Sequence, residues 1–219
     1  MNTLELLNIT SVIVPDRAAI VFEKKRITYA QLRERVTKLA HALLGMGVGS
    51  GDRVASMQVN CNEQIEAYFA AASIDAVYVP INFRSSVEEI AYMVKDCGPT
   101  VILAGERYVE MIEDVLSKSS SEINLIILDG MRDGWTEYEG LLEVDPREQL
   151  HPLGGGDELT MLMFTAGTTG SPKAVMLTHE SFTSYILSNV SPAELDIEEK
   201  NILTVPLYHI AGVQAVMAA

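Results

Sequence analysis

The segment from residue 163 to residue 174 contains the side chains best suited to chemistry in this chain. Its sequence is MFTAGTTGSPKA, so three threonines, two glycines and a lysine fall within nine residues. Glycines allow a backbone to approach an anion closely, hydroxyl and amide groups donate hydrogen bonds to its oxygens, and a lysine supplies the opposite charge. These residue types in this order predict a loop that binds a triphosphate.

The loop differs from two familiar glycine-rich phosphate loops. A Walker A loop requires G-x-x-x-x-G-K-[ST] followed directly by a helix. Here Gly167 and Gly170 are three residues apart, Pro172 precedes Lys173, and an apolar run follows. The segment does not match G-x-G-x-x-G either. The alternative interpretation is a hairpin turn without a ligand, because glycine and threonine are common in turns generally.

Apolar runs on both sides of the loop predict the strands that position it. Residues 161–164 precede the loop and residues 175–177 follow it, which favours strand, loop and strand. A helix is expected to begin at Thr178 or His179, and His179 is expected to lie on the surface at this helix start. Residues 202–205 are predicted to form a further strand.

Upstream of the loop, predicted strands and helices alternate from about residue 28 to residue 129. Two helix starts have the capping-box pattern, in which a hydroxyl residue precedes Gln or Glu by three positions: Thr28 with Gln31, and Ser86 with Glu89. Short apolar runs such as residues 76–81 are typical of strands buried on both faces. The alternation predicts an α/β fold, with a parallel sheet and covering helices.

We expect three parts along the chain. An alternating βα subdomain takes up about residues 1–128, and an acidic, turn-rich connector follows over 129–158. Residues 159–219 form the hairpin and the start of a second αβ subdomain. The glycine-rich stretch at residues 45–52 lies between a predicted helix and a predicted strand. It is interpreted as a helix stop, because dinucleotide-binding loops follow a strand.

Composition limits the partners. The net charge of −14, from 16 basic and 30 acidic residues, argues against non-specific binding to nucleic acid or to an anionic membrane. Two cysteines, Cys61 and Cys97, make no disulfide framework, and we expect both to be buried or half-buried. The sequence has neither an apolar run long enough for a transmembrane segment nor a signal-peptide pattern at its start. A cytoplasmic protein is therefore expected.

Residues 163–174 resemble the phosphate loop of the adenylate-forming enzymes, the superfamily of acyl-CoA synthetases, luciferases and peptide-synthetase adenylation domains. The family pattern is aromatic-Thr-Ser-Gly-Thr-Thr-Gly-x-Pro-Lys-Gly. Four further segments are similar to the family in the same order, namely RITYAQL at 26–32, GSGDRVA at 49–55, VPIN at 79–82 and PLYHIAG at 206–212. The resemblance covers essentially the whole chain and implies the N-terminal part of the large AMP-binding domain.

Two positions depart from the family pattern. Ala166 replaces the usual serine and Ala174 replaces the usual glycine. Both side chains are small and the backbone amides remain, so a phosphate cradle can survive. The missing serine hydroxyl would cost one hydrogen bond to a charged group, roughly 1.5–3 kcal/mol of nucleotide affinity.

The resemblance also implies roles for individual residues. The implied ATP-binding set, in which the threonines bind the β- and γ-phosphates, consists of Thr165, Ala166, Gly167, Thr168, Thr169, Gly170 and Lys173. Lys173 would neutralise the leaving pyrophosphate, and His209 would lie beside the adenylate carbonyl. Tyr208 and His209 would form the wall of the acyl pocket. The alternatives are a solvated hairpin lysine and core positions for Tyr208 and His209. No residue is assigned to a metal.

The implied activity is that of an ATP-dependent carboxylate-activating ligase. It would use ATP, Mg²⁺ and coenzyme A to convert a fatty or aromatic carboxylic acid into an acyl-adenylate and then a CoA thioester. Further family motifs lie downstream of residue 219, so the chain is expected to be a fragment that is inactive alone. An adenylation domain that loads a carrier protein and a truncated, non-catalytic binding module are the alternatives. A homodimer is left open.

Overall fold

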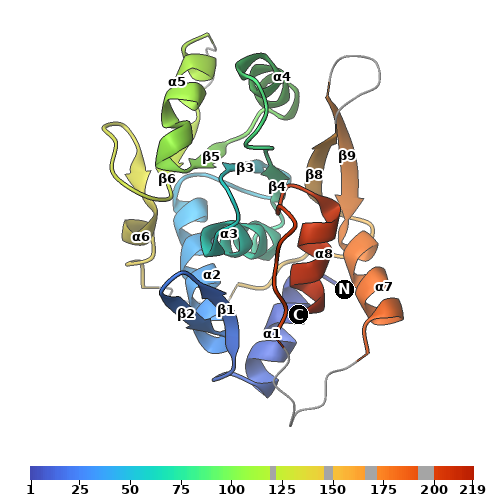
Figure 1. Ribbon diagram of the computed structural model, residues 1–219. Coiled ribbons are helices and arrows are strands. Elements are labelled where there is room, and N and C mark those ends of the chain that lie inside the picture. Colours follow the sequence, from blue (N-terminus) through green and yellow to red (C-terminus); the bar gives the residue numbers. More distant parts are fainter. Residues whose placement is uncertain (119–121, 146–149, 166–171, 192–199) are drawn as a thin grey trace.

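A mixed α/β architecture is seen in a computed structural model (Figure 1). The described residues are 1–118, 122–145, 150–165, 172–191 and 200–219. Seven strands form one sheet in the order β7-β6-β5-β3-β4-β8-β9. Every neighbouring pair is parallel except β8 and β9, which are antiparallel. The strands are β3 (Arg53–Met57), β4 (Val77–Pro80), β5 (Val101–Ala104), β6 (Asn124–Ile127), β7 (Thr136–Glu137), β8 (Leu159–Thr165) and β9 (Lys173–Thr178).

A separate two-stranded antiparallel ribbon consists of β1 (Ala18–Phe22) and β2 (Lys25–Thr28). The helices are α1 (Leu4–Ile13), α2 (Tyr29–Gly45), α3 (Asn62–Ser73), α4 (Val87–Cys97), the short 3₁₀ helix η1 (Glu106–Tyr108), α5 (Val109–Ser117), α6 (Tyr138–Leu141), α7 (His179–Asn189) and α8 (Ile210–Ala218). The predicted capping boxes are confirmed at the starts of α2 and α4, and Thr178 with Ser181 forms a third at α7.

The helices cover both faces of the sheet, which explains the continuous apolar runs of the strands. On β3, Val54 packs with α2 and α3, whereas its neighbour Ala55 packs with α4 and α5. The same alternation separates Val101 from Ile102 on β5, as expected for side chains that point to opposite faces at successive positions. Helices α1, α7 and α8 add to the α2–α3 side (Figure 1).

Strands β3, β4 and β8 are adjacent and parallel, so their carboxyl ends lie at one edge of the sheet. Residues that follow these strands are therefore brought together although they are far apart in sequence. This edge is where ligands bind in open α/β sheets.

The predicted α/β fold with a parallel sheet is confirmed. The predicted strand at 202–205 is wrong, because these residues are irregular and the Val205 carbonyl bonds to a side chain instead of a strand. Helix α1 and the β1–β2 ribbon were not expected, and the connector contains β7 and α6. The three-part division stays a prediction, while β8 and β9 extend the same sheet as β3 to β7.

Within the ranges given above, no helix has both the length and the apolar character needed to span a bilayer.

Candidate functional site

The β8–β9 hairpin brings two of the predicted ATP-binding residues side by side. Thr165 ends β8, Lys173 begins β9, and the two are partners in the antiparallel register. The Thr165 hydroxyl donates to the Lys173 carbonyl at 3.4 Å, and both residues are exposed. Thr165 and Lys173 thus flank the predicted phosphate-loop segment, at the edge of the sheet where the carboxyl ends of β3, β4 and β8 lie. The predicted roles of the intervening residues lie outside the described part of the chain, namely those of Ala166, Gly167, Thr168, Thr169 and Gly170.

The base of this hairpin is tied to the N-terminus through His179, the first residue of α7. His179 is only 2% exposed, so the expected surface position is wrong. The Thr3 backbone N–H donates to His179 Nδ1 at 3.1 Å, and the Thr3 hydroxyl lies 3.1 Å from the same nitrogen. Tyr68 donates to the Thr3 hydroxyl at 2.8 Å, and Thr160 of β8 donates to Tyr68 at 3.4 Å.

The Thr3 contact favours the neutral imidazole that carries its proton on Nε2, although Nε2 lies 3.4 Å from the Asn2 amide nitrogen, which is also a donor. Because Nδ1 accepts from a backbone N–H, it cannot hold a proton in this arrangement. Burial lowers the pKa of His179 below its ordinary value, although Asp75 and Glu158 act in the opposite direction. The hairpin base is therefore attached to residue 3 by a neutral histidine.

Tyr208 and His209 reach the same edge of the sheet from the end of the chain. Tyr208 is buried, and its ring meets the Phe83 ring edge-on with centroids 5.2 Å apart. Phe83 follows β4, the neighbour of β8. His209 is exposed, precedes the first residue of α8 and lies 4.5 Å from the Tyr208 ring, centroid to centroid. The two predicted wall residues thus differ in exposure, since Tyr208 is buried against Phe83 and His209 is exposed.

Sequence reasoning missed two residues that contact the segment at 205–208, Asn60 and Phe83. The Asn60 amide donates to the Val205 carbonyl and accepts from the Leu207 N–H, both at 2.9 Å. Asn60 follows β3 and Phe83 follows β4, so the available signal was their position at the carboxyl ends of two predicted parallel strands.

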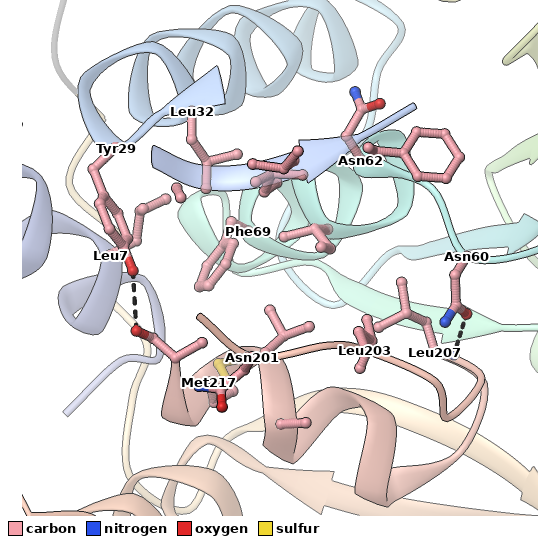
Figure 2. Close-up of a pocket in the computed structure, with 18 of the residues that line it drawn as sticks. Leu7, Tyr29, Leu32, Asn60, Asn62, Phe69, Asn201, Leu203, Leu207 and Met217 are labelled. Atoms are coloured by element: carbon pink, nitrogen blue, oxygen red, sulfur yellow. Dashed lines mark hydrogen bonds between the residues drawn. The ribbon is translucent and has the colours of Figure 1, made fainter. Parts of the chain in front are cut away.

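A cavity of about 490 Å³ lies between the N-terminal elements and residues 201–219 (Figure 2). Its walls are mainly apolar and come from α1, β1, α2, α3 and α8. Leu207 lines it, whereas Tyr208 is turned to Phe83, and neither Thr165 nor Lys173 contributes. Figure 2 shows the Asn60–Leu207 bond and a bond of 3.1 Å from the Tyr29 hydroxyl to the Ala219 carbonyl. The cavity is thus separate from the hairpin that flanks the phosphate-loop segment.

Among the described residues, no three or more His, Cys, Asp or Glu side chains are grouped so that they could hold a metal ion. Both cysteines are buried, as expected, and burial raises the pKa of Cys97 to about 11.

The AMP-binding enzyme family matches residues 12–219. This chain belongs to the AMP-binding enzyme family. The match includes the hairpin, the segment at 206–212 and all but the first 11 residues of the chain.

Relatives within the AMP-binding enzyme family include CoA ligases for aromatic and aliphatic acids. An indoleacetate–CoA ligase of Aromatoleum aromaticum is 31% identical over 202 residues, which cover 90% of this chain and 39% of that protein. The long-chain-fatty-acid–CoA ligase FadD13 of Mycobacterium tuberculosis is 31% identical, with 88% and 37% covered. A feruloyl-CoA synthase of Amycolatopsis is 31% identical, with 90% and 38% covered. The chain thus spans about two fifths of the length of these relatives.

Solved structures of AMP-binding enzymes share the fold. The N-terminal domain of FACL13 from Mycobacterium tuberculosis superposes with a TM-score of 0.82 at 26% identity, covering 99% of this chain and 54% of that one. A long-chain-fatty-acid CoA ligase, described as putative, from Rhodopseudomonas palustris gives a TM-score of 0.87 at 24% identity, covering 100% and 56%.

Proposed function

We propose that this chain is part of an ATP-dependent acid–thiol ligase that forms an acyl-adenylate and then a CoA thioester. The observation that supports the proposal most strongly is the β8–β9 hairpin. It holds the exposed Thr165 and Lys173 side by side at the edge of the sheet that Phe83, Tyr208 and His209 also occupy. CoA ligases among the relatives support the same reaction class.

The proposed reaction has two steps. A carboxylate oxygen attacks the α-phosphorus of ATP, the bond from that phosphorus to the bridging oxygen breaks, and pyrophosphate leaves. The thiol of CoA then loses its proton, attacks the acyl carbonyl carbon and displaces AMP. Mg²⁺ would enter with ATP, and we assign no ligand for it to this chain. The protein contributes mainly positioning and charge stabilisation, as in phosphoryl transfer generally.

We assign Lys173 to the charge that develops on pyrophosphate. It projects from the start of β9 and is exposed, so its ammonium group can reach an anion held by the preceding loop. We assign the hydroxyls of Thr165, Thr168 and Thr169 to the β- and γ-phosphates. His209 and the supporting Tyr208 are assigned to the wall beside the reacting carbonyl.

Carboxylate-dependent ATP–pyrophosphate exchange by the full-length protein tests the proposal. Short, medium, branched and aromatic acids should be compared, since the relatives act on different classes. Exchange should require one acid class and should fall at least about 100-fold in Lys173→Ala, because charge stabilisation is a large catalytic term. Lys118→Ala is the matched control, since Lys118 is an exposed lysine paired with Asp114 on α5.

The exchange assay and the identity of the acyl acceptor distinguish the CoA ligase from the two alternative functions. Exchange followed by transfer to CoA identifies the ligase, and transfer only to a phosphopantetheinyl protein identifies a carrier-loading adenylation domain. Folded full-length protein without exchange for any acid would refute the proposal and favour a non-catalytic binding module. The 219-residue chain alone is expected to give no complete adenylation, because it spans about two fifths of its relatives.

A further inference from the structure

The backbone around Pro206 is held by a single side chain from a distant loop. Asn60 donates through Nδ2 to the Val205 carbonyl and accepts through Oδ1 from the Leu207 N–H, both at 2.9 Å. Pro206 lies between these two residues and has no N–H of its own. A carboxamide offers a donor and an acceptor together, so Asn60 satisfies both backbone groups as a neighbouring strand would.

A tight turn links Leu207, which is hydrogen-bonded to Asn60, with His209. The His209 N–H donates to the Pro206 carbonyl at 3.0 Å, and the Gly212 N–H donates to the His209 carbonyl at 2.9 Å. A Cβ at Gly212 would lie 2.4 Å from the Pro206 carbonyl oxygen, so the first turn of α8 rests directly on this carbonyl. Little backbone freedom therefore remains between the two bonds of Asn60 and His209.

Asn60 is itself fixed to the centre of the sheet. It lies between β3, the strand flanked by β4 and β5, and Cys61, the N-cap residue of α3. Gln64 of α3 donates to the Gln58 carbonyl at 3.2 Å and braces the connection. The position of residues 205–209 is thus held relative to β3. Phe83, which follows β4, supports Tyr208.

We propose that Asn60 is a positioning residue, which sets where His209 stands relative to the phosphate-loop hairpin. Strand β8 lies two strands away from β3 in the same sheet, so a His209 anchored to the end of β3 keeps a fixed relation to Thr165. Asn60 acts through His209 and does not touch the reacting atoms. The inference rests on the proposed ligase function.

Steady-state exchange kinetics of the full-length protein test this role. Asn60→Ala should lower kcat for ATP–pyrophosphate exchange by roughly 10- to 100-fold, since displacements near 1 Å reduce rates on this scale. KM for ATP should change by less than about threefold, because the loop that binds ATP is not touched. Asn60→Asp keeps the size of the side chain but turns a carboxylate oxygen toward the Val205 carbonyl, and it should be at least as slow.

Asn124→Ala provides the matched control. The Asn124 carboxamide also bonds to backbone of distant segments, at Met46 and Thr100, but from the amino end of β6. Its loss should leave kcat within about twofold, because it lies at the opposite edge of the sheet from His209.

A double-mutant cycle with His209→Ala decides whether Asn60 acts through His209. In the His209→Ala background, Asn60→Ala should cost less than about threefold, because the group it positions is already gone. Equal losses in both backgrounds would overturn the proposal, as would an Asn60→Asp enzyme with normal kcat. If His209→Ala alone has no effect while wild type exchanges normally, the assignment of His209 falls and that of Asn60 with it, but the ligase function stands.

Amide hydrogen exchange supplies a readout that does not depend on turnover. The Leu207 N–H should exchange at least about tenfold faster in Asn60→Ala than in wild type, because its acceptor is removed. Unchanged protection at Leu207 and His209 would overturn the proposal even if catalysis were slow. Wild-type protein without any exchange activity would instead refute the ligase function, on which the role of Asn60 depends.

Discussion

Acid should weaken the attachment of the N-terminal segment to α7, through the buried His179. The imidazole is unprotonated at Nδ1 because that atom accepts from the Thr3 backbone N–H at 3.1 Å. A proton on Nδ1 would face this N–H, and Nδ1 could then no longer accept from the Thr3 hydroxyl 3.1 Å away. The folded state therefore resists protonation of His179, whereas the unfolded chain does not.

The magnitude follows from linkage between proton binding and folding. Burial lowers the folded pKa of His179 from 6.5, so the unfolded state binds more protons at acid pH and stability falls as pH falls. The stabilisation is complete above pH 6.5 and is lost below it, until the lowered folded pKa is reached. Between pH 7.5 and 5.5 the loss can reach about 1.4 kcal/mol, the value for a histidine that is protonated only when unfolded.

Urea unfolding of wild type and His179→Asn at pH 7.5 and 5.5 measures the pH-dependent stability that His179 contributes. Asparagine can present Oδ1 near the position of Nδ1 but does not titrate, so the variant should lose up to about 1.4 kcal/mol less between the two pH values. His151→Asn, which changes an exposed histidine, should behave as wild type. Equal losses in wild type and His179→Asn would refute the assignment of a neutral His179.

Two further stability predictions concern other contacts of the fold. Gly212→Ala should destabilise the chain by about 1–3 kcal/mol in urea unfolding, because its Cβ would lie 2.4 Å from the Pro206 carbonyl oxygen and crowded cores resist added atoms. The control is Gly45→Ala, which should not destabilise the chain because a Cβ there would meet nothing within 4 Å. Equal urea midpoints for the two variants would contradict the reasoning. Glu66→Ala should cost about 1–3 kcal/mol by the same assay, since it removes the buried carboxylate that accepts from Arg35 and Tyr138 at 3.0 and 2.6 Å, while Arg35 keeps its pair with Glu139. A loss below about 1 kcal/mol would show that water replaces the carboxylate.

The parts of the fold that depend on local signals could be predicted from the sequence. A capping box needs only four consecutive residues, and the predicted boxes at Thr28 and Ser86 are present. The apolar run at 202–205 has the same local pattern as a strand, yet it is irregular. The deciding partner there is Asn60, which lies 145 residues away from Val205 and takes the hydrogen bond that a strand neighbour would otherwise use.

In the candidate site too, local signals could be predicted from the sequence, but contacts between distant residues could not. The strand, loop and strand around residues 163–174 could be predicted from the flanking apolar runs, whereas the pairing of Thr165 with Lys173 comes from the structure. His179 could not be placed, since a histidine at a helix start is ordinarily exposed, and its burial depends on Thr3, 176 residues away. Composition and periodicity contain no information on contacts of this range.

One strand pairing joins the two halves of the candidate site. Strand β8 pairs with β4 in parallel, with Tyr78 opposite Met161. Because the strands are parallel, Thr165 at the end of β8 lies at the edge of the sheet where Phe83 meets Tyr208. If β8 ran antiparallel to β4, the loop would emerge at the opposite edge, and Lys173 could not act on the same substrate as His209. The chemistry we propose therefore depends on a pairing between residues 83 positions apart, which the sequence of neither strand specifies by itself.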